Sequence, residues 1–306
     1  MRRFLIDTDT ASDDAVALVM ALQEPTVSVD AITVVAGNVP LDQAVQNALY
    51  TVELCCSAVP VYAGRAAPLM RQLQTAEVVH GNDGMGDIGL PLSGRASAGP
   101  TAIDVIIDTI MGSPGEVTLV TLGPLTNVAT ALLRQPALAD AVAHCFVMGG
   151  AGMGPGNVTP LAEFNLWCDP EAARTVIRSG MPLTHIGWDI SVASATFDPD
   201  QATALRSCGP LGEFSVDIQA VLDIYSREAS GLPGFDLPDP IAMAVAIDPS
   251  IATTQRRHVD VLIGDGADRG KDVIDWHGVT DGKPNIDVVI DVPREHFVSI
   301  LHRLLS

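Results

Sequence analysis

The chain has 306 residues, of which 47% are hydrophobic and 18% are charged, a composition that excludes a disordered protein and supplies apolar material for a large core. The formal net charge of −20 argues against partners such as nucleic acid or an anionic membrane surface. Small neutral ligands or cations suit this charge better, although an acidic surface is also a common aid to solubility.

The chain shows no sign of division, export or membrane insertion. No linker, repeat or change of composition interrupts it, so we expect a single domain over residues 1–306. The first apolar run is too short for a secretory signal, and no later run reaches membrane-spanning length. Five cysteines without disulfide or zinc spacing indicate reduced thiols. These features predict a cytoplasmic protein.

Short apolar runs rich in β-branched residues alternate with helical patterns along the chain. The predicted strands begin at residues 4, 27, 117, 144, 183, 259 and 286. The clearest helical patterns cover 13–22, 41–56, 101–112, 125–135 and 169–180. This alternation predicts an α/β fold with an open, mainly parallel sheet flanked by helices on both faces.

Polar residues and glycines follow several predicted strands at the point where each strand ends. Asp7 and Asp9 follow the first strand, Asn38 follows the second, and Gly123 and Gly149 follow two later ones. Ligands of open α/β sheets bind in the crevice at the carboxyl ends of the strands. We therefore expect these residues to converge on one site.

Four aspartates, Asp7, Asp9, Asp13 and Asp14, stand within eight positions where the first strand meets the first helix. Two carboxylates about 4 Å apart repel each other by roughly 4 kcal/mol at an effective dielectric near 20. The helix N-terminus compensates only up to about 1 kcal/mol for each acid. A divalent cation would supply the missing positive charge, and a set of oxygen ligands suggests calcium or magnesium. The simpler alternative is that the aspartates cap and solvate a loop.

The chain resembles the inosine/uridine-preferring nucleoside hydrolase family through a series of motifs spread over nearly its whole length. In chain order they are "DTDTASDD" at 7–14, "AGNV" at 36–39, Asn47, "VYAG" at 61–64, "HGNDGMG" at 80–86, "LGPLTN" at 122–127, "MGG" at 148–150, "GNVTPLAEFN" at 156–165, "DPEAA" at 169–173, "PDP" at 238–240 and "DRG" at 268–270. The resemblance implies a Rossmann-like nucleoside hydrolase fold and calcium-dependent hydrolysis of the N-glycosidic bond of ribonucleosides. It also implies a homodimer or homotetramer.

The resemblance implies a calcium ion held by Asp9, Asp14, Asp239 and the backbone carbonyl of Leu122. Asp9 would also deprotonate the attacking water, with Asn38 helping to hold that water, and Asp7 would support the cluster from behind. Because the reaction passes through an oxocarbenium-like sugar, the enzyme must grip the ribose hydroxyls and stabilise the departing base.

The resemblance also implies a set of substrate-binding residues. They are Asp13, Asn157, Glu163 and Asn165 at the ribose hydroxyls, Met148 along the sugar, and Phe164 either beside the base or in the core. A cis-diol on the sugar is then an expected requirement of the substrate.

One position departs from the family pattern. Many members carry a proton-donating histidine immediately before the late calcium-binding aspartate, where this chain has Pro238. His80 is then the best remaining candidate for the acid, or else it only fixes the loop or the pocket wall. Tyr225 and Trp167 either contact the base or pack. The base preference stays open.

Other classes of protein remain as alternatives. A nucleoside- or ribose-binding protein of the same fold with little or no turnover would keep the calcium and sugar residues while lacking the acid. The strand-end "DTD" also resembles the haloacid dehalogenase type of phosphatase, but the lysine that this class needs between its acidic motifs is missing, since Lys271 and Lys283 both come later.

Overall fold

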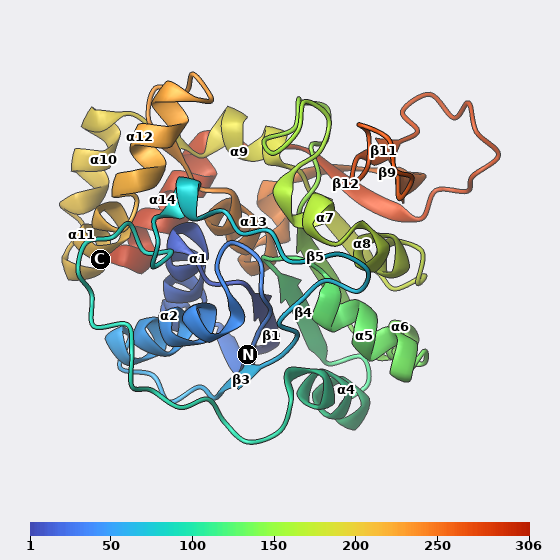
Figure 1. Cartoon of the computed structure of the whole chain (residues 1–306), viewed down its shortest axis with the longest axis horizontal. Coiled ribbons are helices and arrows are strands. Elements are labelled where there is room, and N and C mark those ends of the chain that lie inside the picture. The colour runs from blue at the N-terminus through green and yellow to red at the C-terminus, as the bar shows by residue number, and fades with distance from the viewer.

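The computed structural model describes residues 1–306 and has an eight-stranded sheet at its centre (Figure 1). The strand order is β3-β2-β1-β4-β5-β6-β12-β9, and every neighbouring pair is parallel except β12 with β9. These strands are β1 (Arg2–Thr8), β2 (Val27–Val34), β3 (Val61–Ala63), β4 (Val117–Thr121), β5 (His144–Met148), β6 (Leu183–Ile186), β9 (Thr253–Arg257) and β12 (Ile286–Asp291). Two small antiparallel pairs lie outside the sheet: β7 (Thr196–Phe197) with β8 (Phe235–Asp236), and β10 (Val259–Val261) with β11 (Asp272–Ile274).

Fourteen α-helices and one 3-10 helix surround these strands. They are α1 (Ser12–Gln23), α2 (Leu41–Leu54), α3 (Glu77–His80), α4 (Ala102–Gly112), α5 (Thr126–Arg134), α6 (Leu138–Ala141), α7 (Phe164–Cys168), α8 (Pro170–Ile177), α9 (Trp188–Ser194), α10 (Pro199–Arg206), α11 (Pro210–Asp217), α12 (Ala220–Glu228), α13 (Pro238–Ile247), η1 (Pro249–Ile251) and α14 (Arg294–Leu305). None of them combines the length and apolar character that crossing a membrane requires.

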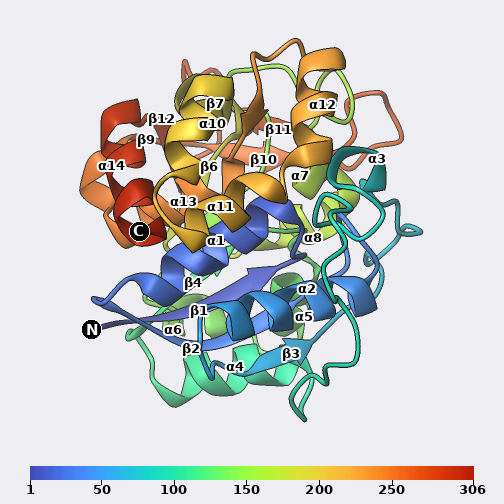
Figure 2. The same cartoon turned by 90° about the vertical axis from the view of Figure 1, so that its left-hand side faces the viewer.

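The sheet separates two hydrophobic cores, as the alternation of side chains along β1 requires. Phe4 and Ile6 belong to a core of 48 buried residues that includes α1, α13 and α14, whereas Leu5 belongs to a core of 30 that includes α4, α5 and α8. Figure 2 shows the sheet between these two helical layers. The predicted α/β fold with helices on both faces is therefore confirmed.

The buried strand predicted at residue 259 is present as β10, but it lies outside the central sheet. Val259–Val261 pairs with β11 outside the central sheet, and the polar segment Thr253–Arg257 occupies the edge beside β12 instead. The apolar side chains of Val259 and Val261 are buried in the smaller core, so hydrophobicity alone did not distinguish a strand of the main sheet from a packed two-stranded pair.

The expected convergence of strand ends is confirmed. Asp9, Asn38, Leu122 and Met148 come from the carboxyl ends of β1, β2, β4 and β5, which are neighbours in the sheet. Three of these four residues line a single pocket at that edge, and Asp9 lies buried behind it.

Candidate active site

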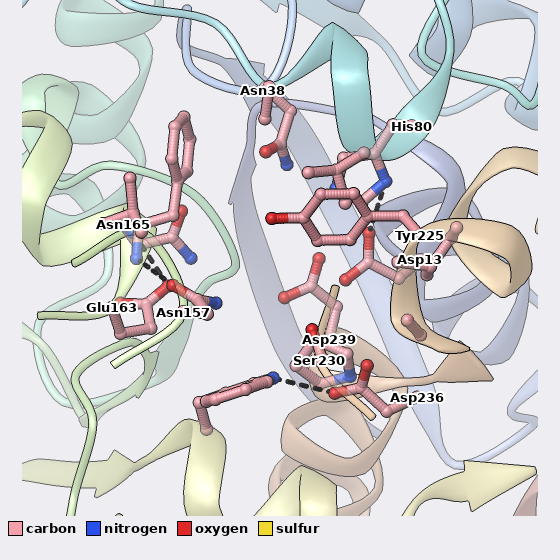
Figure 3. Close-up of a pocket in the computed structure, with 18 of the residues that line it drawn as sticks. Asp13, Asn38, His80, Asn157, Glu163, Asn165, Tyr225, Ser230, Asp236 and Asp239 are labelled. Carbon is pink, nitrogen blue, oxygen red and sulfur yellow. Dashed lines mark hydrogen bonds and ion pairs between the residues drawn. The ribbon is translucent and has the colours of Figure 1, made fainter. Parts of the chain in front are cut away.

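A pocket of about 240 Å³ opens at the carboxyl edge of the sheet (Figure 3). The sequence-predicted residues that line it are Asp13, Asn38, His80, Leu122, Met148, Asn157, Glu163, Phe164, Asn165 and Asp239. Asp9 and Asp14 complete the predicted set but are fully buried and do not line the pocket. The structure thus gathers residues from distant parts of the chain around one cavity.

The carboxylates of Asp13, Asp14 and Asp239 form a buried cluster, with one oxygen of each lying within 4.8 Å of the others. Asp14 is fixed from two sides, because it accepts hydrogen bonds from the hydroxyl of Thr8 and, at 2.9 Å, from the backbone N–H of Ala11. Ala11 is the N-cap of α1, so Asp14 also satisfies a free N–H group at the helix start. Asp239 enters from the first turn of α13.

Asp9 adjoins this cluster but is not among the three acids whose oxygens lie within 4.8 Å of one another. Its Oδ2 accepts a hydrogen bond of 2.7 Å from the backbone N–H of Asn38, and its Oδ1 is buried without a partner. Gly37 and Gly123 leave room for this carboxylate. A Cβ atom on Gly37 would lie 2.1 Å from Oδ2, and a Cβ atom on Gly123 would lie 2.4 Å from Oδ1. The backbone at two strand ends therefore fits closely around Asp9.

The clustered acids are electrostatically unbalanced as they stand. Burial raises the pKa of Asp9, Asp13 and Asp239 well above the ordinary value, and the negative charge of Asp14 raises each of them further. Asp9 Oδ1 and Asp13 Oδ1 are both buried without a hydrogen-bond partner. Buried carboxylate oxygens without hydrogen-bond partners fit a hard divalent cation, for which oxygen is the preferred ligand.

Asp7 lies behind the cluster and is tied into the sheet. Its Oδ1 accepts hydrogen bonds from Thr33 Oγ1 at 2.6 Å and from Asn127 Nδ2 at 2.8 Å. Burial raises the pKa of Asp7 to about 7, while these two hydrogen bonds oppose the rise. Asn127 also accepts a hydrogen bond from the backbone N–H of Arg65, so its side chain links β1 to the loop that follows β3.

Asn165 and Glu163 sit at the start of α7 and are held by short backbone contacts. Asn165 Nδ2 donates to the carbonyl oxygen of Leu122 at 2.7 Å and contacts the sulfur of Met148 at 3.2 Å. Glu163 caps α7, because its Oε1 accepts a hydrogen bond of 2.8 Å from the backbone N–H of Asn165. Its Oε2 accepts a hydrogen bond of 2.7 Å from the backbone N–H of Gly150. Burial raises the pKa of Glu163 to about 7.

Asn157 and Phe164 also present groups to the cavity. Asn157 Oδ1 accepts the backbone N–H of Phe164 at 2.9 Å, which leaves the Asn157 side-chain N–H groups available to a ligand. Phe164 and Trp167 are half-buried pocket residues, with ring centroids 6.4 Å apart, and neither belongs to the two hydrophobic cores. Of the two readings of Phe164, the pocket position is the one observed.

His80 and Pro238 lie on the pocket wall. His80 Nδ1 is 2.9 Å from Ser12 Oγ and 3.7 Å from Asp13 Oδ1, and burial lowers the pKa of the imidazole to about 4. Pro238 occupies the first turn of α13, where its missing N–H is not needed by the helix. Tyr225 of α12 also lines the cavity.

Sequence reasoning missed an acidic residue on this wall, Asp236. It is buried, and its Oδ2 accepts hydrogen bonds from the indole N–H of Trp188 at 2.8 Å and from Ser191 Oγ at 2.9 Å. Burial raises the pKa of Asp236, and the bonds from Ser191 and Trp188 oppose that rise. The available signal in the sequence was its position three residues before Asp239, which is close enough for both acids to reach the same pocket.

Comparison with known proteins agrees with this geometry. A family model described as inosine-uridine preferring nucleoside hydrolase matches residues 4–299. The chain is 39% identical to the pyrimidine-specific ribonucleoside hydrolase RihB of Escherichia coli (strain K12 / DH10B), over 97% of this chain and 94% of that protein.

Solved structures give the same result. A plant nucleoside hydrolase, the PpNRh1 enzyme, superposes with a TM-score of 0.92 at 34% identity, covering 100% of this chain and 99% of that one. A purine-preferring ribonucleoside hydrolase from Gardnerella vaginalis gives a TM-score of 0.91 at 31% identity, covering 99% and 98%. The named base preferences of these relatives differ, although the fold is shared.

Proposed function

The chain belongs to the inosine-uridine preferring nucleoside hydrolase family and is a ribonucleoside hydrolase, and we propose that it depends on calcium bound at the buried acid cluster. The observation that carries the proposal is the buried cluster of Asp13, Asp14 and Asp239, together with the unpartnered oxygens of Asp9 and Asp13. Because the relatives are named as hydrolases, turnover is favoured over the alternative of a nucleoside-binding protein.

Asp9, Asp14, Asp239 and the backbone carbonyl of Leu122 would hold the cation. When bound, the cation supplies charge that neutralises the acids, lowers the pKa of a water molecule and offers positions for a vicinal diol. The Leu122 carbonyl has two lone pairs, of which the bond from Asn165 uses one, so it retains capacity for a second partner.

Asp9 acts as the general base in this proposal. The Asn38 backbone N–H fixes one carboxylate oxygen, and the unpartnered Oδ1 is the atom that receives the proton of the attacking water. The side chain of Asn38, which lines the pocket, would hold that water.

The sugar would be gripped by Asp13, Asn157, Glu163 and Asn165, with Met148 along its face. Glu163 is locked by backbone N–H groups, so its orientation is set before the substrate arrives. Hydrogen bonds of this kind that strengthen as the sugar becomes oxocarbenium-like lower the barrier.

The departing base would lie near Phe164 and the opposite wall. Of the two roles open to His80, we propose that of a neutral wall residue, because burial lowers its pKa to about 4 and an imidazole with that pKa carries no extra proton at neutral pH. Its Nδ1, which contacts Ser12 and lies 3.7 Å from Asp13 Oδ1, would help to orient Asp13.

The test is to assay ribose released from inosine, uridine, cytidine and adenosine, with 2′-deoxy analogues as controls for the diol. We expect turnover of at least one ribonucleoside, loss of turnover after chelation, and recovery with calcium. Full activity of protein shown by elemental analysis to be free of metal would refute the calcium proposal. Saturable nucleoside binding without ribose release would favour the binding alternative.

We further propose a cytoplasmic homodimer or homotetramer. All five cysteines are unpaired, which supports a reducing compartment. Sedimentation equilibrium would test the oligomeric state, and a single species of 32.0 kDa would contradict it.

A further inference from the structure

We propose that the preferred substrates are ribonucleosides whose base carries a fixed positive charge, such as N-ribosylpyridinium compounds and N7-alkylated purine nucleosides. The inference rests on the proposed nucleoside hydrolysis and narrows its substrate class. Three features of the pocket carry it: the lack of a well-placed proton donor, the extra carboxylate of Asp236, and the aromatic lining.

A neutral base departs as an anion unless a proton reaches it, so its hydrolysis needs a general acid. The residue immediately before Asp239 is Pro238, which has no proton to give, and no lysine or arginine lines the cavity. His80, the one histidine in the lining, has its Nδ1 directed at Ser12 and Asp13. The weakly acidic hydroxyl of Tyr225 and the Nε2 side of the His80 ring are the donors that remain, so help for a neutral leaving base is limited.

A cationic base removes this requirement. When its C1′–N bond breaks, the bonding electron pair stays on the base nitrogen, and a pyridinium becomes a neutral pyridine. Water adds its hydroxyl to C1′, and its proton passes to Asp9 and then to solvent. The products are ribose, the neutral base and one proton, so no proton donor at the base is needed.

The charge of the lining favours such a substrate. Four carboxylates line the pocket, those of Asp13, Glu163, Asp236 and Asp239, and no basic side chain accompanies them. Asp236 lies outside the cluster that fits a cation, so a bound ion would not use its charge. Burial raises the pKa of Asp236, and both donors to its Oδ2, the Ser191 hydroxyl and the Trp188 indole, oppose this rise by stabilising the ionised form.

Asp236 lies across the pocket from most of the sugar-binding candidates. In Figure 3 three sugar-binding candidates, Asn157, Glu163 and Asn165, lie on one side, and the fourth, Asp13, lies on the other side with Tyr225 and Asp236. At an effective dielectric near 20, a single charge about 7 Å away alters the affinity for a cation by more than about tenfold. Asp236 is thus a specificity-determining residue.

Aromatic rings supply a second attraction for a cation. Phe164, Trp167, Trp188 and Tyr225 all line the cavity, and aromatic faces attract organic cations. Trp167 already does so within the protein, since the Arg71 guanidinium lies 4.4 Å from its ring centroid. The hydrogen bond from the Trp188 indole to Asp236 holds the ring in place, so the carboxylate and this aromatic ring lie side by side in the lining.

The experiment compares two matched pairs of substrates with the wild-type enzyme: 7-methylguanosine against guanosine at mildly acidic pH, and the ribosylpyridinium-3-carboxamide cation against uridine at neutral pH. We expect kcat/KM to be at least about tenfold higher for the cation of each pair. The higher intrinsic lability of cationic nucleosides is controlled by Asp236→Asn, whose amide oxygen can still accept from Trp188 and Ser191. This variant should reduce the cation-to-neutral ratio about tenfold.

Asp108→Asn is the control, because Asp108 lies exposed on α4, which contributes nothing to the pocket, and its loss changes net charge by the same amount. Its ratio should equal that of the wild type. Faster cleavage of guanosine and uridine by the wild type would overturn the inference while leaving nucleoside hydrolysis intact. An unchanged ratio in a folded Asp236→Asn variant would also overturn it, and if that variant does not fold, the wild-type ratios decide. Ribose release from none of the four compounds would overturn both proposals.

Discussion

The side-chain amide of Asn165 donates a hydrogen bond to the backbone carbonyl of Leu122, with 2.7 Å between the nitrogen and the oxygen. Asn165 is a proposed sugar ligand, and the Leu122 carbonyl is a proposed cation ligand. One hydrogen bond therefore joins the two proposed sites. A substitution at Asn165 should change the affinity of the protein for the cation.

This link predicts that Asn165→Leu, which removes the side-chain amide without adding charge, weakens both calcium and substrate binding. The new side chain has no N–H to donate, so the Leu122 carbonyl is no longer held in place. We expect a calcium Kd and a KM that are each raised about three- to tenfold, since a neutral hydrogen bond is worth about 0.5–1.5 kcal/mol. Titration calorimetry and steady-state kinetics measure the two effects.

Asn157→Asp is the matched comparison. Asn157 keeps its acceptor role toward the Phe164 backbone after this change and has no contact with Leu122. It should raise KM while leaving the calcium Kd within about twofold. Equal calcium affinity in both variants would show that the Asn165 bond does not connect the sites.

Gly37→Ala should abolish activity without unfolding the protein. Its Cβ would lie 2.1 Å from Asp9 Oδ2, so Asp9 must move away from the Asn38 N–H. We expect kcat to fall at least about 100-fold, as misplacement of a catalytic group by about 1 Å can cost this much. Gly112→Ala, where nothing lies within 4 Å of the new Cβ, serves as control and should match the wild type.

Asp9→Asn should reduce kcat by about 10²- to 10⁴-fold, the usual contribution of a general base. The amide oxygen of the variant can still accept from the Asn38 backbone, so the fold should persist, and circular dichroism checks this. Turnover close to the wild-type rate would exclude Asp9 as the base.

Stabilisation by calcium should increase with pH. Burial, followed by mutual repulsion, raises the folded-state pKa of the cluster acids, and burial raises the pKa of Asp7 and Glu163 to about 7. Acids with raised pKa values make the metal-free protein lose stability as pH rises from about 4, the ordinary aspartate value, to about 7. A bound cation prefers the ionised acids and reverses that trend.

The measurement is the difference in Tm with and without calcium at several pH values in this window. Taking the difference cancels the contribution of acids outside the cluster such as Asp275, whose pKa is lowered by hydrogen bonds from Thr280. We expect the difference to be small near pH 4 and to grow toward pH 7. A difference that is constant across the window would mean that the cation binds elsewhere.

Much of the fold and of the site could be predicted because the signals are local. Asp9 directly after β1, Asp14 in the first turn of α1, and the helical and strand patterns are each recognisable within short stretches of sequence. The edge strand Thr253–Arg257 escaped prediction because its exposed side chains are polar, as an edge permits. Asp236 escaped because its partner Trp188 lies 48 residues away, and no local pattern records that contact.

The residues proposed for the cation and the sugar come from the ends of central strands and from the starts of α1, α7 and α13. Much of the remaining lining comes from α3, α12 and the loops beside them, at 74–80 and 222–230, which contribute no strand to the sheet. This part of the pocket wall thus comes from segments separate from those that carry most of the cation and sugar residues. Exchanging segments 74–80 and 222–230 between homologues should therefore change which bases are accepted, while the residues proposed for the cation and the sugar stay the same. Such exchanges provide a practical starting point for directed evolution.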